Sequence, residues 1–213
     1  MTTLLLIRHG ESEANRGAYF AGQTDAALLD KGLRQAEKTA EFIKNNYSVT
    51  GIFTSDLRRA YDTGKALGSI IDIVPTPDKR LREIYAGKWQ GMKFDDIEKT
   101  YEDDYGVWRF DIGNCVTTDG ESVRALARRV MECLEDIARN NDGGVIAVST
   151  HATPIRAVQC VISGHDLDKM KDIPWVTNAS VTEISFSDGT WTLEKICLDA
   201  HLSKLCTSFP ANV

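Results

Sequence analysis

The sequence predicts an α/β protein, specifically a three-layer α/β/α sandwich with a mostly parallel central sheet. Short apolar runs of strand length alternate with longer segments in which apolar residues recur at helical spacing. This alternation is typical of parallel strands joined by crossover helices. Near the end of the chain, two alternating segments flank a tight turn, and this pattern predicts an antiparallel hairpin.

The first strand is predicted at Thr3 to Ile7, which is almost continuously apolar. The residues from Arg8 to Leu29 follow no regular period, so we expect a functional loop that contains at most a short helix. Asp30 is expected to cap the next helix. The apolar residues of that helix fall on one stripe: Leu33, Ala36, Ala40 and Ile43.

The second and third strands are predicted at Gly51 to Thr54 and at Asp72 to Val74, the latter followed by two prolines. Asp56 is expected to cap the helix between them, which extends to about Ile70.

Residues 78–119 are less regular and rich in aromatic side chains. We expect a short strand or loop and one or two small helices, which form a cap-like insertion over the edge of the sheet. Most of its aromatic residues are interpreted as core, although Tyr85 and Trp89 fit a substrate platform equally well. Thr118 to Glu121 has the pattern of a capping box for the next helix.

The remaining elements follow from similar patterns. A helix is predicted to end at Gly143-Gly144, with an apolar face of Val123, Leu126, Val130, Leu134 and Ile137. A buried strand is expected at Val145 to Val148 and a helix at Pro154 to Ile162. The hairpin strands are expected at Val181 to Phe186 and Trp191 to Ile196.

The composition limits the class of protein. The 213 residues are 42% hydrophobic and 26% charged, with a net charge of −6. We interpret residues 1–213 as a single domain with a true core. No basic face suggests nucleic acid, and the early apolar run is too short for a leader or a membrane span. The five cysteines form no CxxC pair, so reduced thiols in a cytoplasm are expected, with Cys133 and Cys160 in the core.

Three predicted strands end on residues that suit phosphate chemistry. The first is followed by Arg8-His9-Gly10-Glu11-Ser12, the second by Ser55 to Ala60, and a later one by Thr150-His151. Parallel strands end at one edge of the sheet, so these side chains can converge. Two arginines and two histidines would repel one another in an empty pocket. They suit a phosphate dianion, which each of them can contact through charge-assisted bonds.

These segments resemble the histidine phosphatases, the phosphoglycerate-mutase-like superfamily. The resemblance covers nearly the whole chain and keeps the family's order. Its matching positions are Arg8 to Ser12 with Asn15, Thr54-Ser55 with Arg59-Ala60 and Thr63, Leu81-Arg82-Glu83 with Gly87-Lys88-Trp89-Gln90-Gly91, Thr150-His151-Ala152 with Ile155-Arg156, and the tail residues Asn178-Ala179-Ser180 and His201-Leu202.

The resemblance implies a role for each catalytic candidate. His9 would be the nucleophile that forms a phosphohistidine, with its second ring nitrogen donating to a backbone carbonyl. Arg8, Arg59 and His151 would hold the equatorial phosphoryl oxygens. Glu83 would protonate the leaving alcohol and then deprotonate water, which requires a raised pKa. Glu11, beside the nucleophile, is a rival for that role.

Further residues would complete the site. Asn15, Gly22 and Gln23 would donate hydrogen bonds to phosphate. Ala21 stands where mutases of the family carry a hydroxyl, and Ala152 replaces a glycine and narrows the pocket. Neither a metal nor another cofactor is expected, because arginine and histidine supply the positive charge. Arg58 is expected on a solvated helix face.

The predicted function is metal-independent hydrolysis of a small phosphomonoester by a monomer or homodimer. A 2,3-bisphosphoglycerate-dependent phosphoglycerate mutase is the alternative. Mutases of the family carry an arginine pair after a tryptophan, whereas Trp108 is followed here by Arg109 and then Phe110. A non-catalytic phospho-ligand binder ranks lower, because all five catalytic candidates are present. The natural substrate would be set by residues 78–119.

Overall fold

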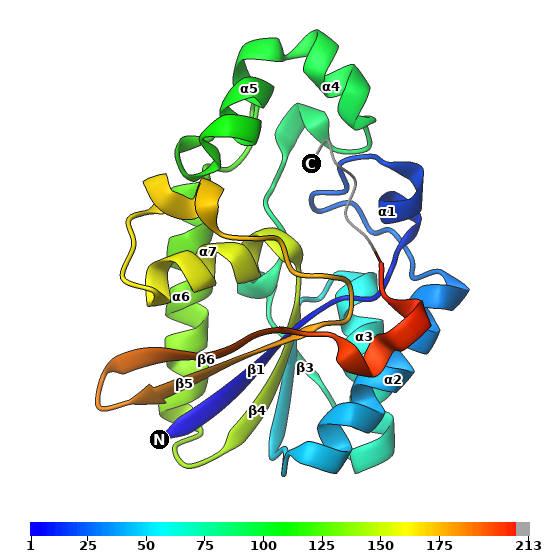
Figure 1. The fold of residues 1–213 in the computed structure, drawn as a ribbon, viewed down its shortest axis with the longest axis vertical. Helices are drawn as coiled ribbons and strands as arrows, with labels where there is room; N and C mark the ends of the chain where they lie inside the picture. The colour runs from blue at the N-terminus through cyan, green and yellow to red at the C-terminus, as the bar shows by residue number, and fades with distance from the viewer. Residues whose placement is uncertain (208–213) are drawn as a thin grey trace.

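A computed structural model describes residues 1–207 and confirms the predicted fold class. Its six-stranded sheet has the order β3-β2-β4-β1-β5-β6 (Figure 1). The strands are β1 (Thr2–Arg8), β2 (Gly51–Thr54), β3 (Thr76–Pro77), β4 (Val145–Thr150), β5 (Val181–Ser187) and β6 (Thr190–Leu198). Strands β3, β2, β4 and β1 run parallel, whereas β5 and β6 are antiparallel to their neighbours.

Strand β1 is buried on both faces of the sheet. Leu4 and Leu6 belong to one hydrophobic cluster, and Leu5 and Ile7 belong to the other. Because side chains alternate along a strand, the continuous apolar run supplies both layers of the core. This explains why the strand was predictable from composition alone.

Helices cover both faces of the sheet (Figure 1). Helices α2 (Asp30–Asn46) and α3 (Arg58–Ile71) pack together and supply one cluster with Ala40, Ile43 and Leu67. Helices α6 (Val123–Asn140) and α7 (Ala152–Ile162) form the opposite layer. The predicted apolar face of α6 is fully buried, and Cys133 and Cys160 lie in its cluster, as expected.

Three smaller helices lie toward the carboxyl ends of the parallel strands. They are α1 (Glu13–Gly17), α4 (Phe94–Thr100) and α5 (Glu102–Phe110). Helices α4 and α5 stand at the top of Figure 1, beyond the sheet. The predicted short helices of residues 78–119 are therefore present, with Trp89 and Tyr105 buried in the main core.

The predicted start and stripe of α2 need correction. Asp30 is the first helical residue and Leu29 precedes it as the cap, while Leu33 is 45% exposed. The inward position belongs instead to Gln35, whose amide accepts from Glu11 N and donates to Leu205 O. A polar residue with specific partners has thus taken a place that periodicity alone assigns to an apolar one.

Two predictions around α3 are also wrong. Asp56 does not cap this helix, because both its oxygens accept from Arg82, each at 2.6 Å. Residues 72–74 are not a strand: Asp72 has a left-handed conformation and Ile73 N donates to Gly68 O, so they close α3. The third strand is the two-residue pair Thr76–Pro77.

The boundaries of α6 and α7 differ slightly from prediction. Ser122 caps α6 by accepting from Ala125 N, whereas Thr118 bonds to Trp89 and Asp104 instead of forming a capping box. Helix α7 begins at Ala152 and so carries Pro154 in its first turn, where proline needs no amide hydrogen.

Candidate active site

Strand register brings the predicted catalytic residues to one edge of the sheet. Arg8 pairs with Thr150 and Thr54 pairs with Ser149, so the next residues, His9, His151 and Ser55, emerge side by side. A cavity opens at this edge. Its polar end is lined by Arg8, His9, Asn15, Arg59, Glu83 and Asn178.

His9 is oriented by bonds at both ring nitrogens. Nδ1 lies 2.7 Å from Gly10 O, so it donates there and leaves a lone pair on Nε2. Nε2 accepts from Arg59 Nε at 3.3 Å. Burial, followed by the charges of Arg59 and Arg8, holds the pKa of His9 well below its usual value. The ring is therefore neutral near neutral pH, as a nucleophile must be.

Gly10 allows the loop after His9 to pack closely against the start of α2. A β-carbon at this position would overlap the carbonyl of Gly32 at the start of α2. Gly10 N also donates to Thr63 Oγ1, which in turn donates to Arg59 O. The loop after the nucleophile is thus tied to both α2 and α3.

His151 faces His9 with a ring separation of 5.2 Å. Its Nε2 bonds Ser55 Oγ at 2.8 Å. Its Nδ1 is buried and finds no hydrogen-bond partner among residues 1–207. Burial, then the charge of Arg59, lowers the pKa of His151 well below its usual value. This unpaired nitrogen lies beside the nucleophile, although His151 is fully buried and is absent from the residues that line the cavity.

Arg8 and Arg59 put two buried positive charges beside His9. Arg59 donates to Thr24 O and Gly22 O, each at 2.8 Å, and Arg8 donates to Val176 O at 2.5 Å. Burial lowers the pKa of each guanidinium to about 10, so both stay charged at neutral pH. The main-chain bonds fix these charges in the absence of a ligand.

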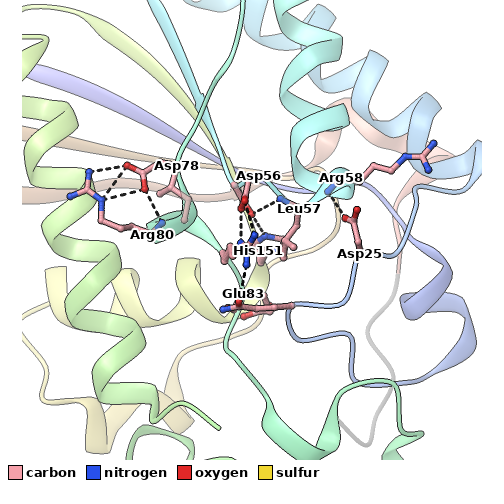
Figure 2. Close-up of polar contacts among 12 residues, drawn as sticks. Asp25, Asp56, Leu57, Arg58, Asp78, Arg80, Glu83 and His151 are labelled. Carbon is pink, nitrogen blue, oxygen red and sulfur yellow. Dashed lines mark hydrogen bonds and ion pairs between the residues drawn. The ribbon is translucent and has the colours of Figure 1, made fainter.

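Glu83 lies close to His151 in Figure 2. Its Oε1 accepts from Ile84 N at 2.8 Å and its Oε2 from Thr153 N at 3.4 Å, at the start of α7. Burial outweighs these bonds and raises the pKa of Glu83. Arg129 of α6 holds the main chain here by donating to Glu83 O at 2.9 Å and to Arg82 O at 2.8 Å.

The predicted substrate-binding residues fall into two groups. Asn15, Ala21, Gly22 and Ala152 line the cavity. Asn15 Oδ1 already accepts from Ser12 and Asn178, so only its amino group can reach a phosphate. Gln23 lies behind the cavity wall, where it donates to Glu83 O and accepts from Arg82. Gln23 therefore supports the main chain at Glu83.

Three residues weighed in the sequence have clear positions. Glu11 lines the cavity but is paired with Lys31 at 2.9 Å. Arg58 points away from Glu83 and His151 in Figure 2, with its side chain 64% exposed, as expected. Arg109 pairs with Glu98 at 2.8 Å and is absent from the residues that line the cavity.

Sequence reasoning missed the apolar end of the cavity. Phe20, Phe94, Trp108 and Trp175 line it. Trp108 was interpreted as core, and its 3% exposure shows why a ring at the cavity wall resembles a core residue. Asn178, which donates to His9 O at 3.0 Å, also lines the cavity. Only its family-like Asn-Ala-Ser context could have indicated it.

Residues 1–207 hold neither a metal cluster nor a membrane-spanning helix. No group of three or more histidine, cysteine, aspartate or glutamate side chains is arranged to hold a metal ion. No helix in this part of the chain combines the length and apolarity needed to cross a bilayer.

Comparison with known proteins gives a consistent result. The family model for the histidine phosphatase superfamily (branch 1) matches residues 4–199. Phosphoserine phosphatase 1 of Hydrogenobacter thermophilus is 28% identical, covering 96% of this chain and 96% of that protein. The metal-independent phosphoserine phosphatase of Arabidopsis thaliana is also 28% identical, covering 96% of this chain and 85% of that protein. The structure of Bacillus stearothermophilus YhfR has a TM-score of 0.91 at 25% identity, covering 95% of this chain and all of that one.

Proposed function

The chain belongs to the histidine phosphatase superfamily and is a phosphoric monoester hydrolase, and we propose that it works by transferring the phosphoryl group to Nε2 of His9. The observation that carries this proposal is the arrangement of the His9 ring. Its Nδ1 is committed to Gly10 O, and its Nε2 faces the cavity beside Arg59. A neutral imidazole held in this way is a competent nucleophile near neutral pH.

The first half-reaction forms a phosphoenzyme. The Nε2 lone pair attacks phosphorus, the P–N bond forms, and the P–O bond to the leaving alcohol breaks. Glu83, whose pKa is raised by burial, gives a proton to the departing oxygen. Arg8, Arg59 and Nδ1 of His151 hold the equatorial oxygens, where negative charge is concentrated.

The second half-reaction restores the enzyme. The Glu83 carboxylate takes a proton from water, the water oxygen attacks phosphorus, and the P–N bond breaks. Inorganic phosphate leaves, and His9 returns to its neutral form with Nε2 unprotonated. One carboxyl group serves as acid and then as base, so its pKa must lie nearer neutrality than that of a free glutamate. The raised pKa of Glu83 supports this role.

Rapid-quench labelling tests the proposal. The full chain is mixed with a ³²P-labelled phosphomonoester and quenched in alkaline denaturant within milliseconds. We expect label on the protein that is stable to alkali and labile to acid, located on the peptide that contains His9.

A matched pair of histidine variants controls the experiment. His9→Ala should take up no label and release no phosphate, whereas His165→Ala, on the exposed surface, should behave like the wild type. Phosphate release without any labelled protein would show direct attack by water and would overturn the proposed intermediate. Binding of the phosphomonoester without turnover would instead identify a phospho-ligand binder.

A further inference from the structure

The far end of the cavity is an aromatic wall, formed by Phe20, Phe94, Trp108 and Trp175. Phe20 and Trp108 meet edge to face with ring centroids 5.0 Å apart, and Phe20 and Phe94 meet at 5.9 Å. Trp108 and Trp175 are 6.3 Å apart and inclined by 33°. Four rings from separate segments of the chain therefore form one continuous apolar part of the cavity wall.

Trp175 is held in place from behind. The guanidinium of Arg156 lies 4.2 Å from the centroid of its ring. Arg156 is itself fixed, because it donates to Ile173 O at 2.6 Å and to Lys171 O at 3.1 Å. A ring positioned by a buried cation–π contact is a preorganised part of a binding surface.

Positive charge in the cavity is confined to the His9 end. Among the lysine and arginine side chains of residues 1–207, only those of Arg8 and Arg59 line the cavity. Their proposed role is to hold the phosphoryl group. The carboxylate Glu11 already has a partner in Lys31. A substrate carboxylate placed against the wall would lose its hydration without gaining a counter-charge, which is unfavourable. An uncharged apolar group would gain from the same burial.

We propose that the preferred substrates are phosphate monoesters of uncharged, ring-bearing alcohols, with the ring seated against Phe20, Phe94, Trp108 and Trp175. This inference rests on the proposed function, since the phosphate must lie at His9 for the alcohol to reach the wall. It sets this chain apart from the phosphoserine phosphatases that it resembles, because phosphoserine carries a carboxylate and an ammonium group.

Three alkyl phosphates, whose leaving alcohols all need protonation, test the inference. They are 2-phenylethyl phosphate, ethyl phosphate and phosphoserine, and kcat/KM is measured for each with the full chain by phosphate release. We expect 2-phenylethyl phosphate to exceed each of the others by at least about tenfold, the size of discrimination that apolar pockets give. Equal values, or a preference for phosphoserine, would overturn the inference.

Paired tryptophan variants connect the preference to the wall. Trp175→Leu should lower the ratio of kcat/KM for 2-phenylethyl over ethyl phosphate at least about fivefold, a fraction of the discrimination above. Trp191→Leu is the control, because Trp191 is a partly buried residue of β6 that packs on Phe186, away from the cavity. Phe94→Leu gives a second test on the opposite side of the wall. An unchanged ratio in both wall variants would contradict the inference.

Failure of the inference differs from failure of the proposed function. If the chain forms the acid-labile phosphoenzyme but prefers phosphoserine, the function stands and the substrate class is wrong. If no substrate labels His9, the proposed phosphohistidine mechanism has failed, whatever the substrate preference.

Discussion

The two ends of the cavity are built in different ways. At the His9 end, polar side chains follow strand ends and are fixed by directional bonds, such as those from Arg59 to Gly22 O and Thr24 O. At the aromatic end, rings come from the loop after α1, from α4 and α5, and from the segment before β5. They are held mainly by ring contacts.

This difference implies that the His9 end carries out the reaction and that the aromatic end selects the substrate. Directional bonds to a rigid sheet place charges with the precision that phosphoryl transfer needs. Packed rings on loops and short helices outside the sheet can change without disturbing it. For substrates whose leaving alcohols need protonation alike, we therefore expect changes at the His9 end to slow all of them equally, and changes at the aromatic end to alter their ranking.

The largest effect is expected for His9→Ala. Loss of the nucleophile should lower kcat/KM on the order of 10⁴-fold or more, by the same factor for 2-phenylethyl and ethyl phosphate. Phosphate release from both substrates measures it. Activity within tenfold of the wild type would mean that the reaction does not pass through His9.

The next effect is expected for Arg59→Lys. Lysine keeps a charge but cannot contact His9, Gly22 O and Thr24 O together as the guanidinium does. We expect kcat to fall on the order of 10²- to 10³-fold for every substrate. Arg58→Lys, one residue earlier and solvent-exposed, should remain within about twofold, as surface changes usually do. If Arg59→Lys changed the ranking of substrates, the two ends of the cavity would not act separately.

Glu83→Gln should change how kcat/KM depends on pH. Because burial raises the pKa of Glu83, the wild type loses its general acid as pH rises through that raised value, and kcat/KM falls. The variant should lack this alkaline decline and be about 10²-fold slower on ethyl phosphate. Its loss on para-nitrophenyl phosphate should be smaller, since that leaving group needs no proton. Matched pH profiles on both substrates test this, and an alkaline limb that persists in the variant would exclude Glu83 as the acid.

The smallest effect on activity is expected for Trp89→Phe. Trp89 is fully buried and contacts Phe20 and Trp108 from the core side, with Nε1 donating to Thr118 Oγ1 at 3.0 Å. Its replacement should lower the free energy of unfolding by about 1–3 kcal/mol, measured by urea denaturation. The substrate ratio should stay unchanged. A shifted ratio would show that the wall depends on the core behind it.

The catalytic end was largely predictable from the sequence because two simple rules apply to it. Buried parallel strands are continuous apolar runs, and residues after such strands share one edge. Thus His9 and His151, more than a hundred residues apart, could be placed together before the structure was known. Their catalytic roles remain predictions until the variants are measured.

The aromatic end could not be predicted for an equally physical reason. Trp108 and Trp89 have the same residue type and nearly the same burial, yet one lines the cavity and the other does not. No periodicity separates them, because the distinction depends on how α4 and α5 pack. The misplaced third strand has a similar origin, since the two-residue pair Thr76–Pro77 is too short to show a period.

The place of β1 in the sheet has a consequence for the mobility of the nucleophile. With β4 and β5 on either side and a core on each face, Leu4 to Ile7 form one of the last segments of the molecule to open. Their backbone amides should exchange with deuterium only when the whole chain unfolds. His9 directly follows this strand, so we expect the position of the nucleophile to vary little in the folded protein.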